Sequence, residues 1–153
     1  MSRRDQIRMT DAEVETFLQE HKTMAIATIG PSGRPHLVAM WYAWVDGDLA
    51  FWTFAKSQKV LNLRRDPRIT CLVEDGAEYN ELRGVELIAT ARMTEDEEQV
   101  LRFGIAEFER YQGAKISEAT LPIVKNMANK RVVVKLDIER VVSWDHRKLG
   151  GQY

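Results

Sequence analysis

Residues 56–68 bring together side chains that could hold a phosphate group. Ser57 is placed to cap a helix, and Lys59 then falls in the first turn of that helix. The first turn of a helix presents unpaired backbone N–H groups and a partial positive charge, so these amides, the Ser57 hydroxyl and the Lys59 ammonium could together bind a phosphate. Five basic residues and one acidic residue lie between Lys56 and Arg68. The alternative is an ordinary solvated helix, because serine caps and surface lysines are common.

An aromatic segment, Leu49 to Phe54, leads directly into this helix. Its composition predicts a short β-strand, since aromatic residues are enriched in strands. A flat apolar wall that ends beside a phosphate-binding group has the shape required by a phosphorylated tricyclic or pyridine ring system. The segment therefore favours a cofactor site over a solvated surface.

The other reactive residue types form no catalytic or metal-binding pattern. Cys71 lies in the middle of a predicted strand without a cationic neighbour, which is typical of a buried, unreactive thiol. The three histidines, His21, His36 and His146, lie far apart and lack the spacing of a metal site. No nucleophile or dedicated general base is evident in the sequence.

Hydrophobic alternation and capping signals predict six strands and four helices along the chain. Thr10 and Glu13 form a capping box before an amphipathic helix, and a second capping box begins at Thr94. Glycine-containing turns at residues 30–33 and 46–48 separate the first three strands. The expected strands are Thr23–Ile29, His36–Val45, Leu49–Phe54, Arg68–Glu74, Gly84–Met93 and Lys130–Trp144. The expected helices cover residues 10–21, 57–65, 94–112 and 117–128.

These elements indicate one mainly β domain over residues 1–153, with α+β as the neighbouring class. Six antiparallel strands with helices at their connections favour a closed or nearly closed barrel, because closure removes exposed sheet edges. A small barrel is filled by its own side chains, so a ligand would bind on the outer wall or at a subunit interface. Trp41 and Trp44 lie three residues apart on one predicted strand and face opposite sides, which places one of them at an interface or pocket.

The composition argues against several classes of protein. The net charge is −1, and aromatic residues do not alternate with a basic face, so nucleic-acid binding is disfavoured. No run of eighteen apolar residues could span a membrane, and the polar N-terminus is unlike a signal peptide. The single cysteine suits a reducing compartment. We therefore expect a cytoplasmic protein with no nucleic-acid or membrane partner.

The order of these motifs resembles that of the split β-barrel flavoproteins related to pyridoxamine 5'-phosphate oxidase. The resemblance extends from Thr23 to Trp144 and rests on the Gly-Pro-Ser-Gly-Arg-Pro turn, the aromatic strand and the Ser-Gln-Lys segment at residues 57–59. Residues 62–68, Asn-Leu-Arg-Arg-Asp-Pro-Arg, are most similar to the flavin/deazaflavin oxidoreductase branch, which uses coenzyme F420. True pyridoxamine phosphate oxidases carry an arginine and a lysine for FMN on the second strand, where this chain has His36 and Trp41. The loss of both cations weakens the case for FMN.

The resemblance implies a cofactor site on the second and third strands, shared between two subunits. Tyr79 and Arg131 would come from the partner subunit, and Arg131 could stabilise the negative charge that develops near N1 of the reduced ring. The implied cofactor-binding residues are His36, Val38, Met40, Trp52 and Thr53 around the ring, Ser57, Lys59 and Asn62 at the phosphate end, and Arg131; Trp41 and Tyr79 would form the substrate pocket.

The expected protein is therefore a homodimeric, six-stranded split β-barrel oxidoreductase that binds coenzyme F420. It would transfer a hydride between the reduced deazaflavin and a small conjugated or carbonyl-activated molecule. One alternative is an FMN-dependent enzyme on the same fold, which would carry a yellow bound flavin. The other is a non-catalytic flavin, deazaflavin or haem carrier, which would bind its cofactor tightly without turnover.

Overall fold

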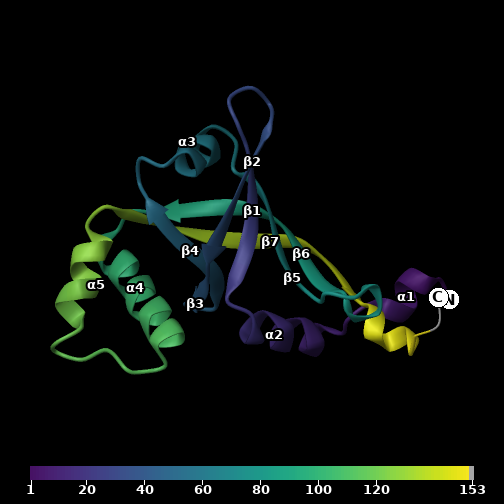
Figure 1. Ribbon diagram of the computed structural model, residues 1–153. Coiled ribbons are helices and arrows are strands. Elements are labelled where there is room, and N and C mark those ends of the chain that lie inside the picture. The colour runs from purple at the N-terminus through teal and green to yellow at the C-terminus, as the bar shows by residue number, and fades with distance from the viewer. Residues whose placement is uncertain (152–153) are drawn as a thin grey trace.

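Seven antiparallel strands form one curved sheet in the computed structural model, which describes residues 1–151 (Figure 1). The strands lie across the sheet in the order β2-β1-β5-β6-β7-β4-β3. The mainly β class expected from the sequence is confirmed, and the curved sheet makes a half-barrel. The strands are β1 Thr23–Ile29, β2 Pro35–Trp41, β3 Ala43–Val45, β4 Asp48–Phe54, β5 Arg68–Asp75, β6 Arg83–Thr94 and β7 Arg131–Asp145.

Helices cover the ends of the barrel and part of its outer face. Helices α4 and α5 pack on the outer face of β3, β4 and the first part of β7, where Trp52, Phe103 and Val133 belong to a second, smaller core. Both helices lie at one end of the sheet, and α1 lies at the other (Figure 1). The helices are α1 Arg3–Ile7, α2 Asp11–Glu20, α3 Gln58–Arg65, α4 Glu97–Gln112 and α5 Leu121–Ala128, with short 3-10 turns η1 Tyr79–Glu81 and η2 His146–Leu149.

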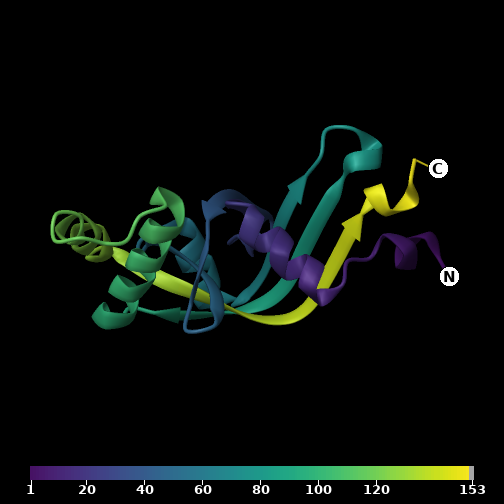
Figure 2. The same ribbon diagram turned by 90° about the horizontal axis from the view of Figure 1, so that it is seen from below.

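The inner face of the sheet packs around the larger hydrophobic core. Side chains alternate along each strand, so β1 turns Met24 and Ile26 inward, where both are fully buried. β6 adds Leu87 to the same core, and α2 adds Phe17. Helix α2 lies across the sheet when the molecule is seen from below (Figure 2). The helix therefore closes one end of the half-barrel.

The helix starts expected from the sequence are confirmed in part. Thr10 caps α2 in a capping box, as expected. The expected capping box at Thr94 is wrong, because α4 begins later, with Asp96 as its cap. The last expected helix, residues 117–128, begins only at Leu121. Residues 117–120 form a separate turn, in which the backbone N–H of Ser117 donates to Thr120 Oγ1 and that of Thr120 donates to Ser117 Oγ.

The expected strand His36–Val45 is interrupted at Tyr42, and this break makes seven strands instead of six. The backbone of Tyr42 bonds to side chains of α4 and not to a neighbouring strand. Its N–H donates to the Tyr111 hydroxyl at 3.0 Å, and its carbonyl oxygen accepts from Arg110 Nε at 3.1 Å. The Tyr42 ring is fully buried, and its hydroxyl donates to the backbone of α2 at 2.6 Å. The expectation of six strands is therefore wrong.

Two strand edges remain unpaired and leave the barrel split. β3 pairs with β4 only from Asp48 to Ala50, and residues 51–54 of β4 pair with β7 alone among the described strands. β2 pairs with β1 alone among the same strands. β2 continues through Tyr42 into β3, and β3 pairs with β4. The unpaired edges of β2 and β4 are therefore close to each other near Tyr42 and separate with distance from it. We call these two edges, residues 35–41 and 51–54, the split.

Candidate cofactor site

Three polar side chains meet where β4 ends and α3 begins. Thr53 lies on the inner face of β4 and is 5% exposed, Ser57 precedes α3, and Lys59 lies in its first turn. Lys59 Nζ donates a hydrogen bond to Thr53 Oγ1 at 2.9 Å. The hydroxyl oxygens of Thr53 and Ser57 are 3.4 Å apart. The structure thus brings together three residues that the sequence assigned to the cofactor, and we call them the Lys59 cluster.

The electrostatics of the Lys59 cluster suit an anion. Burial lowers the pKa of Lys59, and no carboxylate of the described chain forms an ion pair with its ammonium. Ser57 caps α3 by position without a side-chain capping hydrogen bond, so its hydroxyl can donate to a ligand. The first-turn amides of α3 face the same region. A desolvated cation, two hydroxyl groups and a helix N-terminus together fit a phosphate.

Asn62 is placed behind this cluster and not within reach of solvent. Its side chain is fully buried, its Nδ2 donates to Thr28 Oγ1 at 3.0 Å, and its Oδ1 accepts from Gln58 Nε2 at 2.8 Å. These bonds fasten α3 to β1 and use the polar atoms of the Asn62 amide. Asn62 therefore positions the helix that carries Lys59.

His36, Val38 and Met40 lie together on the inner face of β2, along one edge of the split. Their partners across the ladder are the buried residues Thr28, Ile26 and Met24. Val38 and Met40 are partly buried against the main core. His36 Nδ1 is a buried nitrogen without a hydrogen-bond partner in the described structure. Buried polar atoms normally have a hydrogen-bond partner, so this nitrogen is available to an ordered water or to a ligand at the split.

Trp52 does not line the split, contrary to the sequence expectation. Its ring lies beneath α4, 5.9 Å from the Phe103 ring, and a Cβ atom on Gly104 would come within 2.7 Å of it. Successive residues of a strand point to opposite faces, so Trp52 and Thr53 cannot both face the same ligand. Strict alternation would have excluded one of them from the sequence alone.

Arg131 shares the outer face of the sheet with Trp52. Its guanidinium lies 4.8 Å from the Trp52 ring centre and 4.5 Å from that of Phe54, and it donates to the carbonyl oxygen of Met127 at 2.9 Å. Beside it lies Glu107, an acid that the sequence did not single out. Burial raises the pKa of Glu107 to about 7, whereas the Trp52 indole and the charge of Arg131 lower it. Within one chain, Arg131 therefore lies on the opposite face of β4 from Thr53.

The two residues expected in the substrate pocket lie apart from each other. Trp41 is 50% exposed and stacks on Tyr111 of α4, with ring centres 4.0 Å apart. Tyr79 is exposed in η1, and its ring contacts His146 at 4.9 Å. The β5–β6 connection that holds Tyr79 lies far from α3 in both ribbon views (Figures 1 and 2). One chain alone thus does not bring Trp41 or Tyr79 to the Lys59 cluster.

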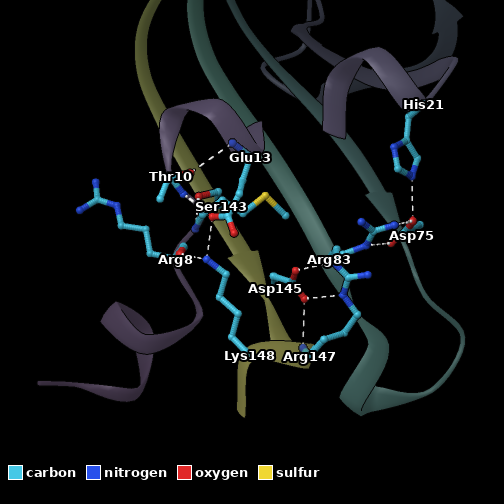
Figure 3. Close-up of polar contacts among 11 residues, drawn as sticks. Arg8, Thr10, Glu13, His21, Asp75, Arg83, Ser143, Asp145, Arg147 and Lys148 are labelled. Atoms are coloured by element: carbon cyan, nitrogen blue, oxygen red, sulfur yellow. Dashed lines mark hydrogen bonds and ion pairs between the residues drawn. The ribbon is translucent and has the colours of Figure 1, made fainter. Parts of the chain in front are cut away.

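A second polar network lies away from α3, where α2 and η2 meet β5, β6 and β7 (Figure 3). It borders a cavity of about 500 Å³. Its charged groups pair with one another and thereby fasten α2 and η2 to the sheet. The contacts are His21–Asp75, Arg83–Asp75, Arg147–Asp145 and Lys148–Glu13. Among the charged residues that line the cavity, only Glu20 has no ion pair in the described chain.

Cys71 is buried in the main core, as the sequence predicted. Burial raises the pKa of its thiol to about 12, so the reactive thiolate is not formed near neutral pH. The thiol therefore acts as an apolar core group.

Comparison with known proteins agrees with this arrangement of strands and helices. A family profile described as pyridoxamine 5'-phosphate oxidase matches residues 10–145. The chain belongs to the pyridoxamine 5'-phosphate oxidase family. This family includes oxidoreductases that bind flavins. No curated protein sequence matches the chain.

Solved structures that are similar to this chain cover 83% to 100% of it in the three cases that follow. The conserved hypothetical protein Rv2991 from Mycobacterium tuberculosis is 46% identical, with a TM-score of 0.92 over 100% of this chain and 95% of that one. An F420 reductase is 26% identical, with a TM-score of 0.64 over 83% and 94%. A haem storage protein from Vibrio cholerae, 18% identical with a TM-score of 0.68 over 87% and 94%, shares the fold. Within residues 1–151, no helix is long and apolar enough to cross a membrane.

Proposed function

We propose that this chain is an oxidoreductase that binds coenzyme F420 beside the split. It exchanges a hydride between the deazaflavin and a small conjugated or carbonyl-activated molecule. The observation that carries the proposal is the Lys59 cluster, in which a partly buried ammonium lacks a carboxylate partner among the described residues and lies beside two hydroxyl groups. The similarity to an F420 reductase supports the choice of cofactor.

In this proposal, different residues along the split bind different parts of the cofactor. The Lys59 cluster holds the phosphate end through charge-assisted hydrogen bonds. The backbone groups of β4 that face the split without a partner in the described chain and the buried Nδ1 of His36 bond to the polar edge of the ring. The Phe54 carbonyl oxygen is not among them, because it accepts from the Ser57 N–H at 3.0 Å. Val38 and Met40 give an apolar surface that excludes water from it. When bound, the deazaflavin supplies the hydride chemistry, and the chain supplies orientation and charge.

The second strand favours the deazaflavin over FMN in this proposal. FMN-dependent members of the resembling group hold their cofactor with an arginine and a lysine at positions where this chain has His36 and Trp41. Neither replacement is a permanent cation, and Trp41 points outward onto Tyr111. An FMN phosphate would therefore meet fewer positive charges here than in those enzymes.

The proposed active unit is a cytoplasmic homodimer with shared sites. Leu37 and Trp41 project from the outer face of β2 and are 70% and 50% exposed, so a second copy packed on this face would bury them. The Arg131 side chain lies on the opposite face of the sheet from Thr53, and Tyr79 lies far from α3; in the proposed dimer both would reach the cofactor of the partner. Analytical ultracentrifugation at low micromolar concentration is expected to show a dimer. A monomer with full cofactor affinity contradicts the shared site.

Replacing Lys59 tests the cofactor site directly. Lys59→Ala removes the unpaired ammonium and is expected to weaken F420 binding about 10- to 100-fold, because hydrogen bonds to charged groups contribute about 1.5–3 kcal/mol. Lys56→Ala is the matched control, since it removes the same charge from an exposed neighbouring position. Calorimetric titration measures both affinities, and circular dichroism verifies the fold. Equal affinities in Lys59→Ala and the wild type would remove the site.

Competition between cofactors separates the remaining possibilities. The wild type is expected to bind F420 more tightly than FMN and to oxidise reduced F420 with an added acceptor. FMN binding of equal or higher affinity rejects the F420 assignment in favour of an FMN-dependent enzyme. Tight F420 or haem binding without turnover of any acceptor indicates a carrier and rejects the enzyme.

A further inference from the structure

Three arginine side chains without an acceptor line one small cavity at the end of the molecule that carries α1. Most arginines of the described chain donate to a carboxylate or a backbone carbonyl oxygen. The exceptions within residues 1–151 are Arg3, Arg4, Arg8, Arg34 and Arg140. Three of these five, Arg4, Arg8 and Arg140, border the same cavity of about 160 Å³.

The cavity forms where α1 rests on β7. Arg4 and Arg8 are four residues apart and therefore share one side of the helical turn. Arg140 faces them from β7. The backbone N–H of Met9 donates to Ser143 Oγ at 3.2 Å, which leaves the Ser143 hydroxyl proton available in the same cavity. In Figure 3 the Arg8 side chain extends away from the ion pairs of the neighbouring network.

The charge of this cavity is unbalanced. Asp5 is the one acidic residue among its described lining residues, and the Asp5 carboxylate is already bonded to Ser2 in the α1 capping box. Three guanidinium groups near one another repel, and this repulsion disfavours the position of α1. α1 has no buried residue, so it gains little from apolar contacts. An anion in the cavity would turn the repulsion into attraction.

The shape and donors of the cavity define the class of anion. Guanidinium groups bind the oxygens of phosphate-type anions in pairs, and three cations suit a doubly charged group better than a carboxylate. A volume of 160 Å³ is about that of five water molecules at ~30 Å³ each, which is enough space for a phosphoryl group. We propose that this cavity binds a phosphate-class oxyanion, as inorganic phosphate or as the phosphoryl end of a larger molecule, and thereby holds α1 on β7.

Calorimetry with inorganic phosphate at constant ionic strength tests the site. Lys59→Ala serves as the parent protein, because it weakens the other site that fits a phosphate. This parent is expected to bind one phosphate saturably, and adding Arg140→Gln is expected to weaken that binding about tenfold or more. Arg34→Gln is the matched control, because it removes one exposed, unpaired arginine from the β1–β2 turn. Affinity unchanged in Arg34→Gln supports the site. No saturable binding, or an equal loss in both variants, overturns it.

Trypsin cleavage after Arg8 tests the link to α1. Phosphate is expected to slow this cleavage in the wild type and not in Arg140→Gln, and equal protection of both variants overturns the proposal. Glycerol 2-phosphate replaces inorganic phosphate in a second arm; its equal binding supports a phosphoryl end as the occupant, and its failure supports the free ion. Acetate binding as tight as that of phosphate rejects the phosphate class. The Lys59 cluster lies elsewhere, so F420 affinity in Arg140→Gln reports separately on the proposed function.

Discussion

The change Asn62→Ala distinguishes a residue that supports the fold from one that binds the cofactor. Asn62 is fully buried and bonds to Thr28 at 3.0 Å and to Gln58 at 2.8 Å. Alanine removes both bonds and leaves the buried Thr28 hydroxyl without this partner. A buried polar group that loses its partner costs about 1–3 kcal/mol, and the space left by the amide adds about 1 kcal/mol. We therefore expect the free energy of unfolding to fall by about 2–4 kcal/mol in the absence of any cofactor.

Urea unfolding followed by tryptophan fluorescence measures this loss. Thr28→Val removes the other side of the bond, and a double-mutant cycle is expected to show a coupling of about 1 kcal/mol between the two positions. Lys56→Ala is the control, because Lys56 is exposed and takes no part in the hydrogen bonds of Asn62, so its loss is expected to cost under about 0.5 kcal/mol. The reasoning is refuted if Asn62→Ala unfolds like the wild type but loses cofactor affinity, since Asn62 would then bind the ligand itself.

Two further changes probe the second core and the β6–β7 ladder. Burial raises the pKa of Glu107 to about 7 from its ordinary 4.5, so stability is expected to fall by up to about 3 kcal/mol as the pH rises from 4.5 to 7. Unfolding of Glu107→Gln across this range should show a flatter profile, and parallel profiles would contradict the burial of this acid. A Cβ atom on Gly84 would lie 2.1 Å from the Trp144 ring, so Gly84→Ala should cost about 1–3 kcal/mol and shift tryptophan emission. The double variant with Trp144→Leu should recover most of this loss, and additive losses would count against the clash.

Elements that depend on nearby residues were predictable from the sequence. The bounds of β1, Thr23–Ile29, are those expected, because the alternation of small and β-branched residues is a local signal. Ser57 and Thr10 were recognised as caps, because a cap depends on residues within one helical turn. Ser57 and Lys59 of the Lys59 cluster are predictable for the same reason, since they lie within one helical turn, whereas Thr53 is assigned to the cofactor by the family resemblance.

Features that depend on distant residues were not predictable in the same way. The break at Tyr42 arises from bonds to α4, and no pattern around residue 42 indicates them. Glu107 is buried because α4 packs over Trp52, and its position in α4 resembles that of any helical acid. The family resemblance assigns Asn62 to the phosphate end, and the sequence does not show that this side of the short helix faces the core. In contrast, Trp52 and Thr53 are adjacent in a strand, so strand alternation predicts from the sequence that their side chains point to opposite faces of the sheet.

The contacts of Tyr42 also have a kinetic consequence for folding. Its backbone bonds to Tyr111, 69 positions further along the chain, and its hydroxyl contacts the carbonyl oxygen of His21, 21 positions before it. Contacts between distant positions form slowly, because a long loop must close before they contribute. The hairpin of β3 and β4 can form early from local contacts. The separation of β2 from β4 at Tyr42 forms later, because it depends on the contacts of Tyr42 with α2 and α4. The two edges of the split would thus be among the last parts of the molecule to take their final positions.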